Sequence, residues 1–213
     1  MPVLFVLTFR AFIAEAYVIP SGSMEGTLLV GDHVGVDKTA FGLRLPFSTF
    51  WLLRGRAPLH GEVVVFYGVE HPQRVLIKRV IGVGGDKVDM RRGRLFVNGR
   101  ALRREVVGAP CVITLEGERK PDLERRCHTH REWAGGAKKS YRIQRLEHAH
   151  GADFQLRVPT GQLFLMGDNR DLSHDSRAFG LVPEAHLLGR ARAVLWSWQG
   201  WKPRWERFFS ALR

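Results

Sequence analysis

The chain has 213 residues, of which 45% are hydrophobic and 25% are charged, and its formal net charge is +12 at pH 7. This length can bury one or two hydrophobic cores, and the composition excludes a disordered tail. A surplus of positive charge suits nucleic acid, anionic lipid or no particular partner. Because no RNA-binding signature or zinc-finger spacing accompanies the charge, we expect a solvated basic face and no nucleic-acid partner.

An apolar segment opens the chain. Residues 2–18 are apolar except for Thr8, Arg10 and Glu15. A helix of this length rises about 25 Å, short of the ~20 apolar residues that span a bilayer comfortably. The small-residue exit of a cleaved signal peptide is missing, because the segment runs directly into Ile19 and Pro20. We therefore predict a membrane anchor helix over residues 1–18, or the outer part of one, with an amphipathic core helix as the alternative.

Short apolar or alternating runs follow Pro20, most of them bounded by Gly, Pro or Asn-Gly. Such runs are typical of β-strands, and Asn98-Gly99 is a favourable two-residue hairpin turn. The sequence therefore predicts a mainly β fold. The predicted strands cover residues 29–36, 62–67, 75–83, 87–90, 94–97, 154–158, 162–166 and 191–196.

Tryptophans gather at the C-terminal end, where residues 196–213 hold four of the six. From Pro203 onward apolar residues recur at helical spacing among arginines, which predicts a basic amphipathic helix opened by proline. Tryptophan favours the bilayer interface and arginine the lipid head groups, so we predict a membrane-interface tail over residues 196–213. The alternative is a helix packed on the β core. The aromatic and apolar residues concerned are Trp196, Trp198, Trp201, Trp205, Phe208, Phe209 and Leu212.

Two cysteines, Cys111 and Cys127, lie in the basic middle of the chain, close to His128 and His130. Their order fits no standard zinc spacing. A disulfide in an oxidising compartment and two free thiols both remain open.

No Ser-His-Asp order, G-x-S-x-G or H-E-x-x-H motif is present, so the candidate chemistry rests on Ser23 and Lys78. Ser23 stands just beyond the apolar N-terminal segment. Lys78 lies in an aliphatic strand, on the same face as Leu76 and Val80. Burial of that face lowers the pKa of a lysine from ~10.4, and a neutral amine can take the proton of a serine hydroxyl. The alternative is a lysine that reaches solvent or pairs with a carboxylate.

A dense polar loop, residues 167–177, follows the predicted strand 162–166. It can form internal ion pairs and offer a hydroxyl to a neighbouring amine. A calcium loop is the alternative, but the closing glutamate is missing, since Ala178 or Phe179 stands in its place.

Together the three segments resemble the bacterial type I signal peptidases. Residues 19–24, Ile-Pro-Ser-Gly-Ser-Met, are similar to the family's nucleophile box, and residues 77–79, Ile-Lys-Arg, to its general-base box. Gly31-Asp32 resembles the strand entry between them. Residues 167–177, continued by 180–184 and 189–191, resemble the last box. The resemblance covers residues 12–90 and 155–196, in matching order and spacing.

The resemblance implies a serine endopeptidase with Ser23 as nucleophile and Lys78 as general base. The Ser21 hydroxyl and the Ser23 amide would form the oxyanion hole. Ser173 would hydrogen-bond Lys78 and orient it.

The resemblance also implies scaffolding and a substrate site. Asp168 would pair with Arg79, and Asp175 with Arg177. Shallow apolar pockets would accept small residues at −1 and −3 of a signal peptide, because a pocket with room for a methyl group excludes larger side chains. The residues expected to line these pockets are Tyr17, Ile19, Pro20, Met24, Leu28, Val65 and Ile77.

The architecture implied by the resemblance is a β catalytic core, residues 19–86 plus 159–195, with a second β domain inserted at residues 87–158. Between Lys87 and Pro159 there are 17 Lys and Arg against 9 Asp and Glu, so most of the positive charge lies in this insertion. The expected partners are signal peptides of secreted preproteins and membrane lipid, and the expected enzyme is a monomer that needs no metal or other cofactor. Its expected place is the bacterial inner membrane, with the catalytic domain on the outer side.

Two positions depart from the family. Gly26 stands where the family usually has proline, and Glu25 adds a carboxylate two residues from Ser23. Lys78, where relatives of the endoplasmic reticulum carry histidine, indicates the bacterial or organelle branch.

Two other functions are alternatives. A repressor-cleaving autoprotease also uses a serine–lysine pair, but it requires a DNA-binding domain where this chain has an apolar segment. A membrane-tethered basic β-protein that binds lipid or nucleic acid without catalysis belongs to a different class.

Overall fold

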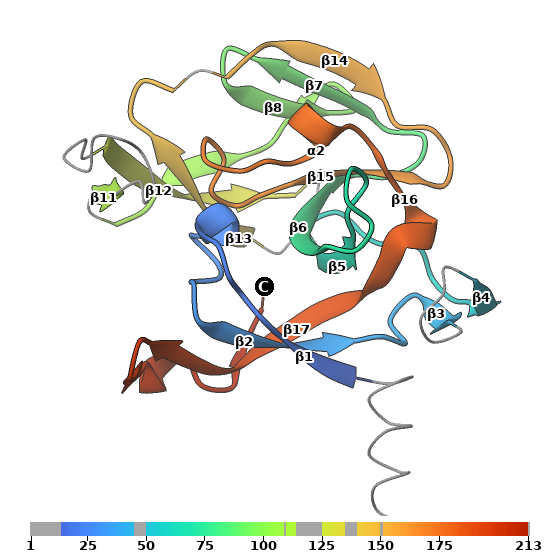
Figure 1. Ribbon diagram of the computed structural model, residues 1–213. Coiled ribbons are helices and arrows are strands. Elements are labelled where there is room, and N and C mark those ends of the chain that lie inside the picture. The colour runs from blue at the N-terminus through green and yellow to red at the C-terminus, as the bar shows by residue number, and fades with distance from the viewer. Residues whose placement is uncertain are drawn as a thin grey trace, which may run out of the picture.

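The computed structural model describes residues 14–44, 50–108, 110–113, 125–134, 140–149 and 151–212. Its largest sheet has nine antiparallel strands and curls around the middle of the molecule (Figure 1). Two short strands, β18 (Lys202–Pro203) and β19 (Ser210–Ala211), pair with β17 off the main path. The order along the path is β1 (Ala14–Val18), β2 (Asp32–Asp37), β17 (Leu187–Gln199), β5 (Val63–Tyr67), β6 (Val75–Gly82), β15 (Gln162–Met166) and β16 (Val182–Pro183).

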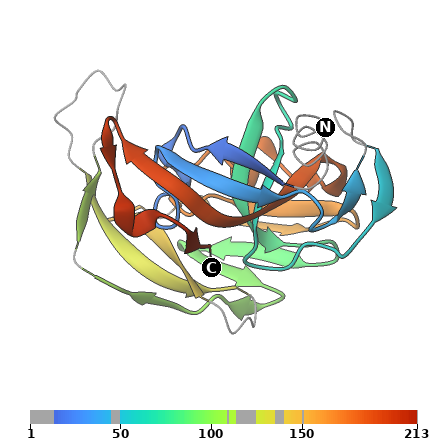
Figure 2. The same ribbon diagram turned by 90° about the horizontal axis from the view of Figure 1, so that it is seen from below.

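Residues 87–157 supply two four-stranded sheets. Figure 2 shows them side by side, green and yellow-green, below the paired strands β2 and β17. One sheet has the order β14 (Phe154–Arg157), β7 (Lys87–Arg91), β8 (Arg94–Val97), β9 (Arg100–Ala101). The other has the order β10 (Arg104–Val106), β12 (Arg125–Trp133), β11 (Cys111–Ile113), and β13 (Ser140–Leu146) pairs with β12.

The remaining elements are short. β3 (Gly42–Arg44) and β4 (Trp51–Arg54) form a separate ribbon. Among the described residues, the helices are the 3₁₀ turns η1 (Gly22–Met24), η2 (Glu184–His186) and η3 (Trp205–Arg207), and the α-helical turn α2 (Ser176–Phe179).

The core consists of apolar clusters on both faces of β5, β6 and β15. Alternate residues of β5 enter different clusters, Val63 and Val65 the first and Val64 and Phe66 the second. This follows from the two-residue period of a strand. A third cluster, around Ile81 and Phe164, joins the large sheet to β7 and β8.

The predicted strands are confirmed, each overlapping β2, β5, β6, β7, β8, β14, β15 or β17. The predicted hairpin is also confirmed, because β8 and β9 pair on either side of Asn98 and Gly99. Both turn residues have positive φ, 52° and 77°, as a type I′ turn requires.

The predicted helix over residues 1–18 is wrong for residues 14–18. These form β1, which pairs with β2 from Ala14↔Asp37 to Val18↔His33. Pairing with a neighbouring strand satisfies the backbone there and overrides the local apolar pattern. Residues 1–13 of the predicted helix lie outside the described residues. Within the described ranges, no helix combines the length and apolar character needed to cross a membrane.

The predicted C-terminal amphipathic helix is also wrong. The segment folds back on β17 as β18, η3 and β19, and Phe209 has a φ of 52° that a helix does not allow. Its backbone donors reach β17 instead: Arg204 N–H donates to the Ser197 carbonyl (3.0 Å) and Leu212 N–H to the Arg192 carbonyl (2.8 Å). Trp205 and Phe209 are exposed and Phe208 and Leu212 are half-buried, so the helical spacing of these apolar residues does not mark a buried helix face.

Of the alternatives for the cysteines, the structure contains the disulfide. Cys111 on β11 lies directly opposite Cys127 on β12, with a Cα–Cα distance of 4.9 Å. Within the described ranges no group of three or more His, Cys, Asp or Glu residues is arranged to hold a metal ion.

Candidate active site

Ser23 and Lys78, 55 residues apart in sequence, meet in the structure. Lys78 Nζ lies 2.6 Å from Ser23 Oγ. Ser23 is in η1, directly after β1, where Ile19 N–H donates to the Asp32 carbonyl (2.9 Å) and Leu28 N–H to the Met24 carbonyl (2.9 Å). The first bond ties the start of the turn to β2 and the second closes the turn on itself, and the Ser23 side chain reaches Lys78 on β6.

Lys78 lies in the middle of β6 with only 3% of its surface exposed. Burial lowers the pKa of its ammonium from the usual value to about 8, against the opposing attraction of the Asp175 and Asp168 carboxylates. The expected burial is therefore present. A lysine in this state supplies a neutral amine at mildly alkaline pH, beside a serine hydroxyl.

The polar loop 167–177 folds around an internal ion pair. Arg177 Nη2 lies 2.7 Å from Asp175 Oδ2, and Gly167 N–H donates to the same carboxylate (3.0 Å). Burial alone would raise the pKa of Asp175, but the hydrogen bonds and charge of Arg177 hold it below its usual range. The expected pair of Asp175 and Arg177 thus closes the loop onto its own start.

Gly167 brings this loop against the η1 turn that carries Ser23. A Cβ placed on Gly167 would lie 2.4 Å from the Ser23 carbonyl oxygen and 2.2 Å from Ser173 Oγ. No side chain fits at this position, because these distances are far inside van der Waals contact. Glycine is therefore what allows the loop to approach Ser23.

The expected hydrogen bond between Ser173 and Lys78 is not formed. Ser173 Oγ is buried beside Gly167 and has no hydrogen-bond partner among the described residues. The amine of Lys78 hydrogen-bonds Ser23 instead. Ser173 lies in the loop that approaches Ser23, as the resemblance implied, but its hydroxyl lies beside the backbone of Gly167 in the same loop.

The second expected ion pair, between Arg79 and Asp168, is the most deeply buried in the described part of the chain. Arg79 Nε and Nη2 donate to the two carboxylate oxygens at 2.7 and 2.6 Å, and both side chains have 0% exposure. Arg79 also donates to the Gly61 carbonyl (2.6 Å) and lies 3.9 Å from the Tyr141 ring centre. Because neighbours on a strand point to opposite faces, Arg79 supports the site from behind Lys78.

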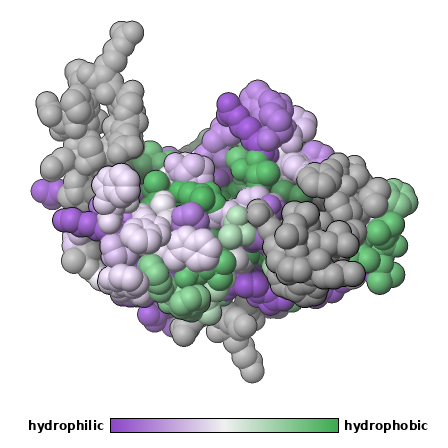
Figure 3. Space-filling view, turned by 60° about the horizontal axis from the view of Figure 1, so that its bottom comes forward, coloured by the Kyte–Doolittle hydropathy of each residue, from purple (hydrophilic) through white to green (hydrophobic). Residues whose placement is uncertain are grey.

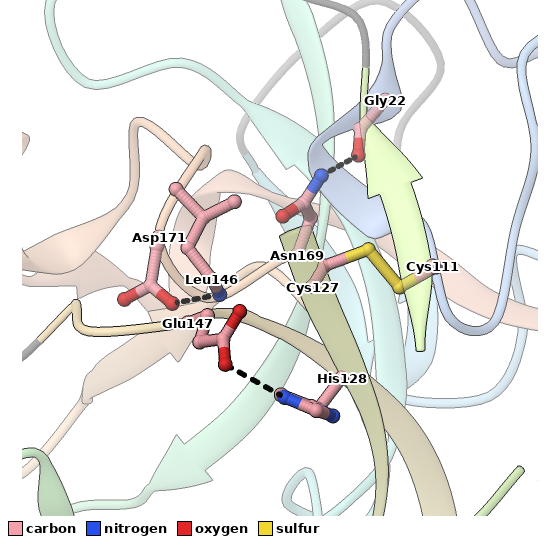
Figure 4. Close-up of a disulfide and its surroundings, with 8 residues drawn as sticks. All are labelled: Gly22, Cys111, Cys127, His128, Leu146, Glu147, Asn169 and Asp171. Atoms are coloured by element: carbon pink, nitrogen blue, oxygen red, sulfur yellow. Dashed lines mark hydrogen bonds and ion pairs between the residues drawn. A yellow bond between two sulfur atoms is a disulfide. The ribbon is translucent and has the colours of Figure 1, made fainter. Parts of the chain in front are cut away.

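Asn169 is a site residue that sequence reasoning did not single out (Figure 4). Its backbone N–H donates to the Ser23 carbonyl (3.1 Å) and its side-chain amide donates to the Gly22 carbonyl (3.1 Å). These two bonds tie the polar loop to the η1 turn. Its place inside the polar loop was the only signal in the sequence.

Residues of the predicted insertion also support the site, which the sequence did not indicate. Gln144 on β13 exchanges backbone hydrogen bonds with the polar loop: its N–H donates to the Asp168 carbonyl (2.8 Å) and its carbonyl accepts from Arg170 N–H (3.0 Å). Asp171 accepts from Leu146 N–H (2.9 Å), beside the disulfide-bonded strand β12 (Figure 4). The β12–β13 hairpin is therefore a direct support for the polar loop.

Ser21, the expected oxyanion donor, precedes η1 and is exposed, with extended backbone angles of −141° and 156°. Its side chain makes no capping hydrogen bond to the turn. The Ser21 hydroxyl is therefore not engaged in a hydrogen bond that caps η1.

The seven side chains expected to line substrate pockets fall into two groups. Four are buried in one hydrophobic cluster and can form only the back of a pocket. The other three keep exposed surface. The buried group is Ile19, Met24, Leu28 and Val65, and the group with exposed surface is Tyr17, Pro20 and Ile77.

The two departures from the family have a local explanation. Gly26 has a φ of 106°, which proline cannot adopt, and a Cβ there would lie 3.1 Å from the Arg142 carbonyl oxygen. Glycine is thus required where β13 passes close to the turn. Glu25 packs its carboxylate over Gly22, and burial raises its pKa.

Comparison with known proteins places these features in one family. The family model described as "Signal peptidase, peptidase S26" matches residues 1–196. Signal peptidase I of Pseudomonas fluorescens is 36% identical over 209 residues, which are 92% of this chain and 70% of that protein. Signal peptidase I of Pseudomonas aeruginosa is 37% identical over 209 residues, which are also 92% of this chain and 70% of that protein. A solved signal peptidase I of Enterococcus faecalis aligns with a TM-score of 0.39 at 23% identity, covering 63% of this chain and 97% of that one. On the family match and the two Pseudomonas relatives, the chain belongs to the signal peptidase family, peptidase S26, and is a signal peptidase, a hydrolase.

Proposed function

We propose that this chain is a membrane-bound endopeptidase that removes signal peptides from exported preproteins, with Ser23 as nucleophile and Lys78 as general base. The observation that carries the proposal is the 2.6 Å approach of a buried lysine amine, with its pKa lowered to about 8, to a serine hydroxyl. Family membership supports the same reaction.

In the proposed reaction, neutral Lys78 accepts the proton of Ser23 Oγ as the oxygen attacks the scissile carbonyl carbon. The Ser23 N–H and the Ser21 hydroxyl donate hydrogen bonds to the oxyanion that forms. The Lys78 ammonium then protonates the departing amine, which leaves an acyl-enzyme on Ser23. Lys78 next takes a proton from water as the water oxygen attacks the ester carbon, and it returns this proton to Ser23 Oγ when the ester bond breaks, which releases the acid product and restores both groups.

An extended substrate segment fits the free part of β6. Residues of β6 before Arg79 pair only with β5 in the described part of the chain, since β15 pairs from Arg79 onward. A peptide that adds to this edge gains backbone hydrogen bonds, and its alternate side chains point to one face. The cluster behind Ile77 then forms the floor for the small −1 and −3 residues, which supports an Ala-x-Ala preference.

We further propose that residues 19–86 and 159–195 form the catalytic core and that residues 87–158 form an inserted domain. Both would lie on the outer side of a bacterial inner membrane. The Cys111–Cys127 disulfide supports an oxidising compartment. Exposed aromatic side chains support contact with lipid: Trp201 is 98% exposed, Phe209 79% and Trp205 68%. Figure 3 shows apolar side chains (green) in the middle and at the edge of one face of the molecule.

Lipid contact gives a prediction. Replacing Trp201, Trp205 and Phe209 with serine in a chain that starts at Ala14 should weaken binding to anionic vesicles at least about tenfold, because interfacial burial of large aromatic rings is lost. Thermal stability should change little, since these rings are exposed. Vesicle flotation and melting curves measure the two effects, and Leu59→Ser, at an exposed apolar side chain elsewhere, is the control. Unchanged flotation with a lowered melting temperature would assign the rings to the fold.

The proposed function is tested by the pH dependence of cleavage. A preprotein with Ala-x-Ala before its cleavage site should be cut after the second alanine, as mass spectrometry of the product shows. The value of kcat/KM should rise about tenfold per pH unit below pH about 8 and level off above it, because only neutral Lys78 accepts the serine proton. An acidic limb that appears only near the pH of a free lysine would exclude Lys78 as the base.

The same pKa shift predicts a stability effect with a defined sign. Between the folded pKa of about 8 and the unfolded value of ~10.4, the unfolded state binds the Lys78 proton and the folded state does not. The free energy of unfolding should therefore rise with pH in this window. Lys78→Met should remove this increment, as denaturant titrations of both proteins at each pH will show.

A further inference from the structure

A cleft of about 320 Å³ opens between the two sheets of residues 87–157, and the peptidase mechanism does not use it. Its polar lining consists of Arg94 on β8, Arg104 on β10, and His130 and Glu132 on β12. The apolar remainder of the lining is Leu95, Leu102 and Val106.

Arg104 has charged neighbours that are mostly of its own sign. Burial, then the positive charges of Arg145, Arg170 and Arg94, lower the pKa of Arg104, and Glu132 is the carboxylate that opposes them. No hydrogen bond or ion pair of the Arg104 side chain is formed with another described residue. A half-buried cation without a counter-charge is unfavourable, because it loses hydration without compensation.

Glu132 does not neutralise Arg104, because its oxygens are already engaged. Oε2 accepts from Arg170 Nη1 (3.0 Å) and Oε1 accepts from Arg170 Nη2 and from the Tyr141 hydroxyl (2.9 Å). The Glu132–Arg170 pair is self-compensating and buried. The Arg104 guanidinium therefore lines the cleft as an uncompensated positive charge, and the exposed Arg94 adds a second guanidinium to the same lining.

His130 completes the donor set. Burial, followed by the charges of Arg104 and Arg145, lowers the pKa of His130 to about 4. The ring is therefore neutral at pH 7 and offers one N–H donor. Two guanidinium groups and one imidazole converge on the same space from three strands.

We propose that this cleft binds the phosphate group of an organic phosphate ester through Arg94, Arg104 and His130. A guanidinium group can donate two parallel hydrogen bonds to two oxygens of a phosphate group, and the opposite charges of the two groups strengthen these bonds. The volume exceeds that of an inorganic ion, since one water occupies ~30 Å³ in the liquid. The apolar wall suits the organic part of the ester. The phosphate comes either from a lipid head group or from a soluble ester.

The test is titration of the full-length protein in detergent with glycerol 3-phosphate at constant ionic strength. The ester should bind in calorimetry and raise the melting temperature, because a ligand of the folded state stabilises it. Arg104→Gln should weaken binding at least about tenfold. Arg100→Gln, which removes an exposed arginine of β9 outside the cleft lining, should leave binding unchanged. Saturation should also raise the His130 pKa in NMR titrations, because a bound dianion favours the imidazolium.

Vesicle flotation distinguishes the two sources. If Arg104→Gln weakens binding to phosphatidylglycerol vesicles more than Arg100→Gln does, the ligand is a lipid head group. If only binding of the soluble ester is lost, the ligand is a soluble phosphate ester. Equal losses in the two variants, absence of ester binding, or an unchanged His130 pKa at saturation would overturn the proposal. Melting temperatures without ligand verify that both variants fold.

Discussion

Ser23→Ala and Lys78→Met should each lower kcat/KM for a preprotein by roughly 10⁴- to 10⁶-fold, as removal of a nucleophile or its base does in other serine peptidases. Ser23→Ala removes the attacking oxygen. Lys78→Met keeps the buried chain length but removes the amine 2.6 Å from that oxygen. Steady-state cleavage of the preprotein, with product identified by mass spectrometry, measures the effect.

Lys78→Arg is the decisive companion variant, because a guanidinium keeps its positive charge and does not accept a proton near neutral pH. It should be as inactive as Lys78→Met. Lys87→Ala, which removes a lysine from the start of β7, should retain full activity. Substantial cleavage by the Ser23 or Lys78 variants would exclude the proposed dyad. If a variant is inactive because it does not fold, its melting curve will show the loss of structure.

Asp168→Ala should lower the free energy of unfolding by about 3–5 kcal/mol, because it leaves a fully buried guanidinium without its counter-charge. Arg79 has 0% exposure and donates two hydrogen bonds to Asp168. The variant should also move the acidic limb of kcat/KM to lower pH, since the Asp168 carboxylate raises the pKa of Lys78. Denaturant titrations and pH profiles measure the two effects.

Asp37→Ala is the matched control for this pair. Asp37 and Arg192 form an ion pair of the same type at 2.7 Å, but Arg192 is half-exposed, so the loss should be about 1 kcal/mol or less. The double variant Arg79→Met, Asp168→Leu should recover part of the stability lost in Asp168→Ala, because no buried charge remains. Equal losses at Asp37 and Asp168 would contradict the role given to burial.

The sequence by itself determined the strand pattern of the core and singled out the two side chains that we propose to be reactive, Ser23 and Lys78. β5 and β6 are short apolar runs, a local pattern that can be recognised without the fold. The two-residue period of a strand places Lys78 on the same face as Leu76 and Val80, and this predicted its burial. The resemblance of three segments to the signal peptidases implied that Ser23 and Lys78 lie together.

Only the tertiary structure decided which segments support that pair. Asn169 reaches the Gly22 and Ser23 carbonyls, and Gln144, from the inserted strands, pairs with the polar loop. Ser173, expected on Lys78, turns toward Gly167. Backbone pairing also made residues 14–18 a strand and folded the C-terminal segment back on β17, where helices were predicted for both. The physical reason is common to all these cases: a backbone or side-chain polar group takes the partner that packing brings to it across long sequence separations, and local periodicity carries no information about that partner.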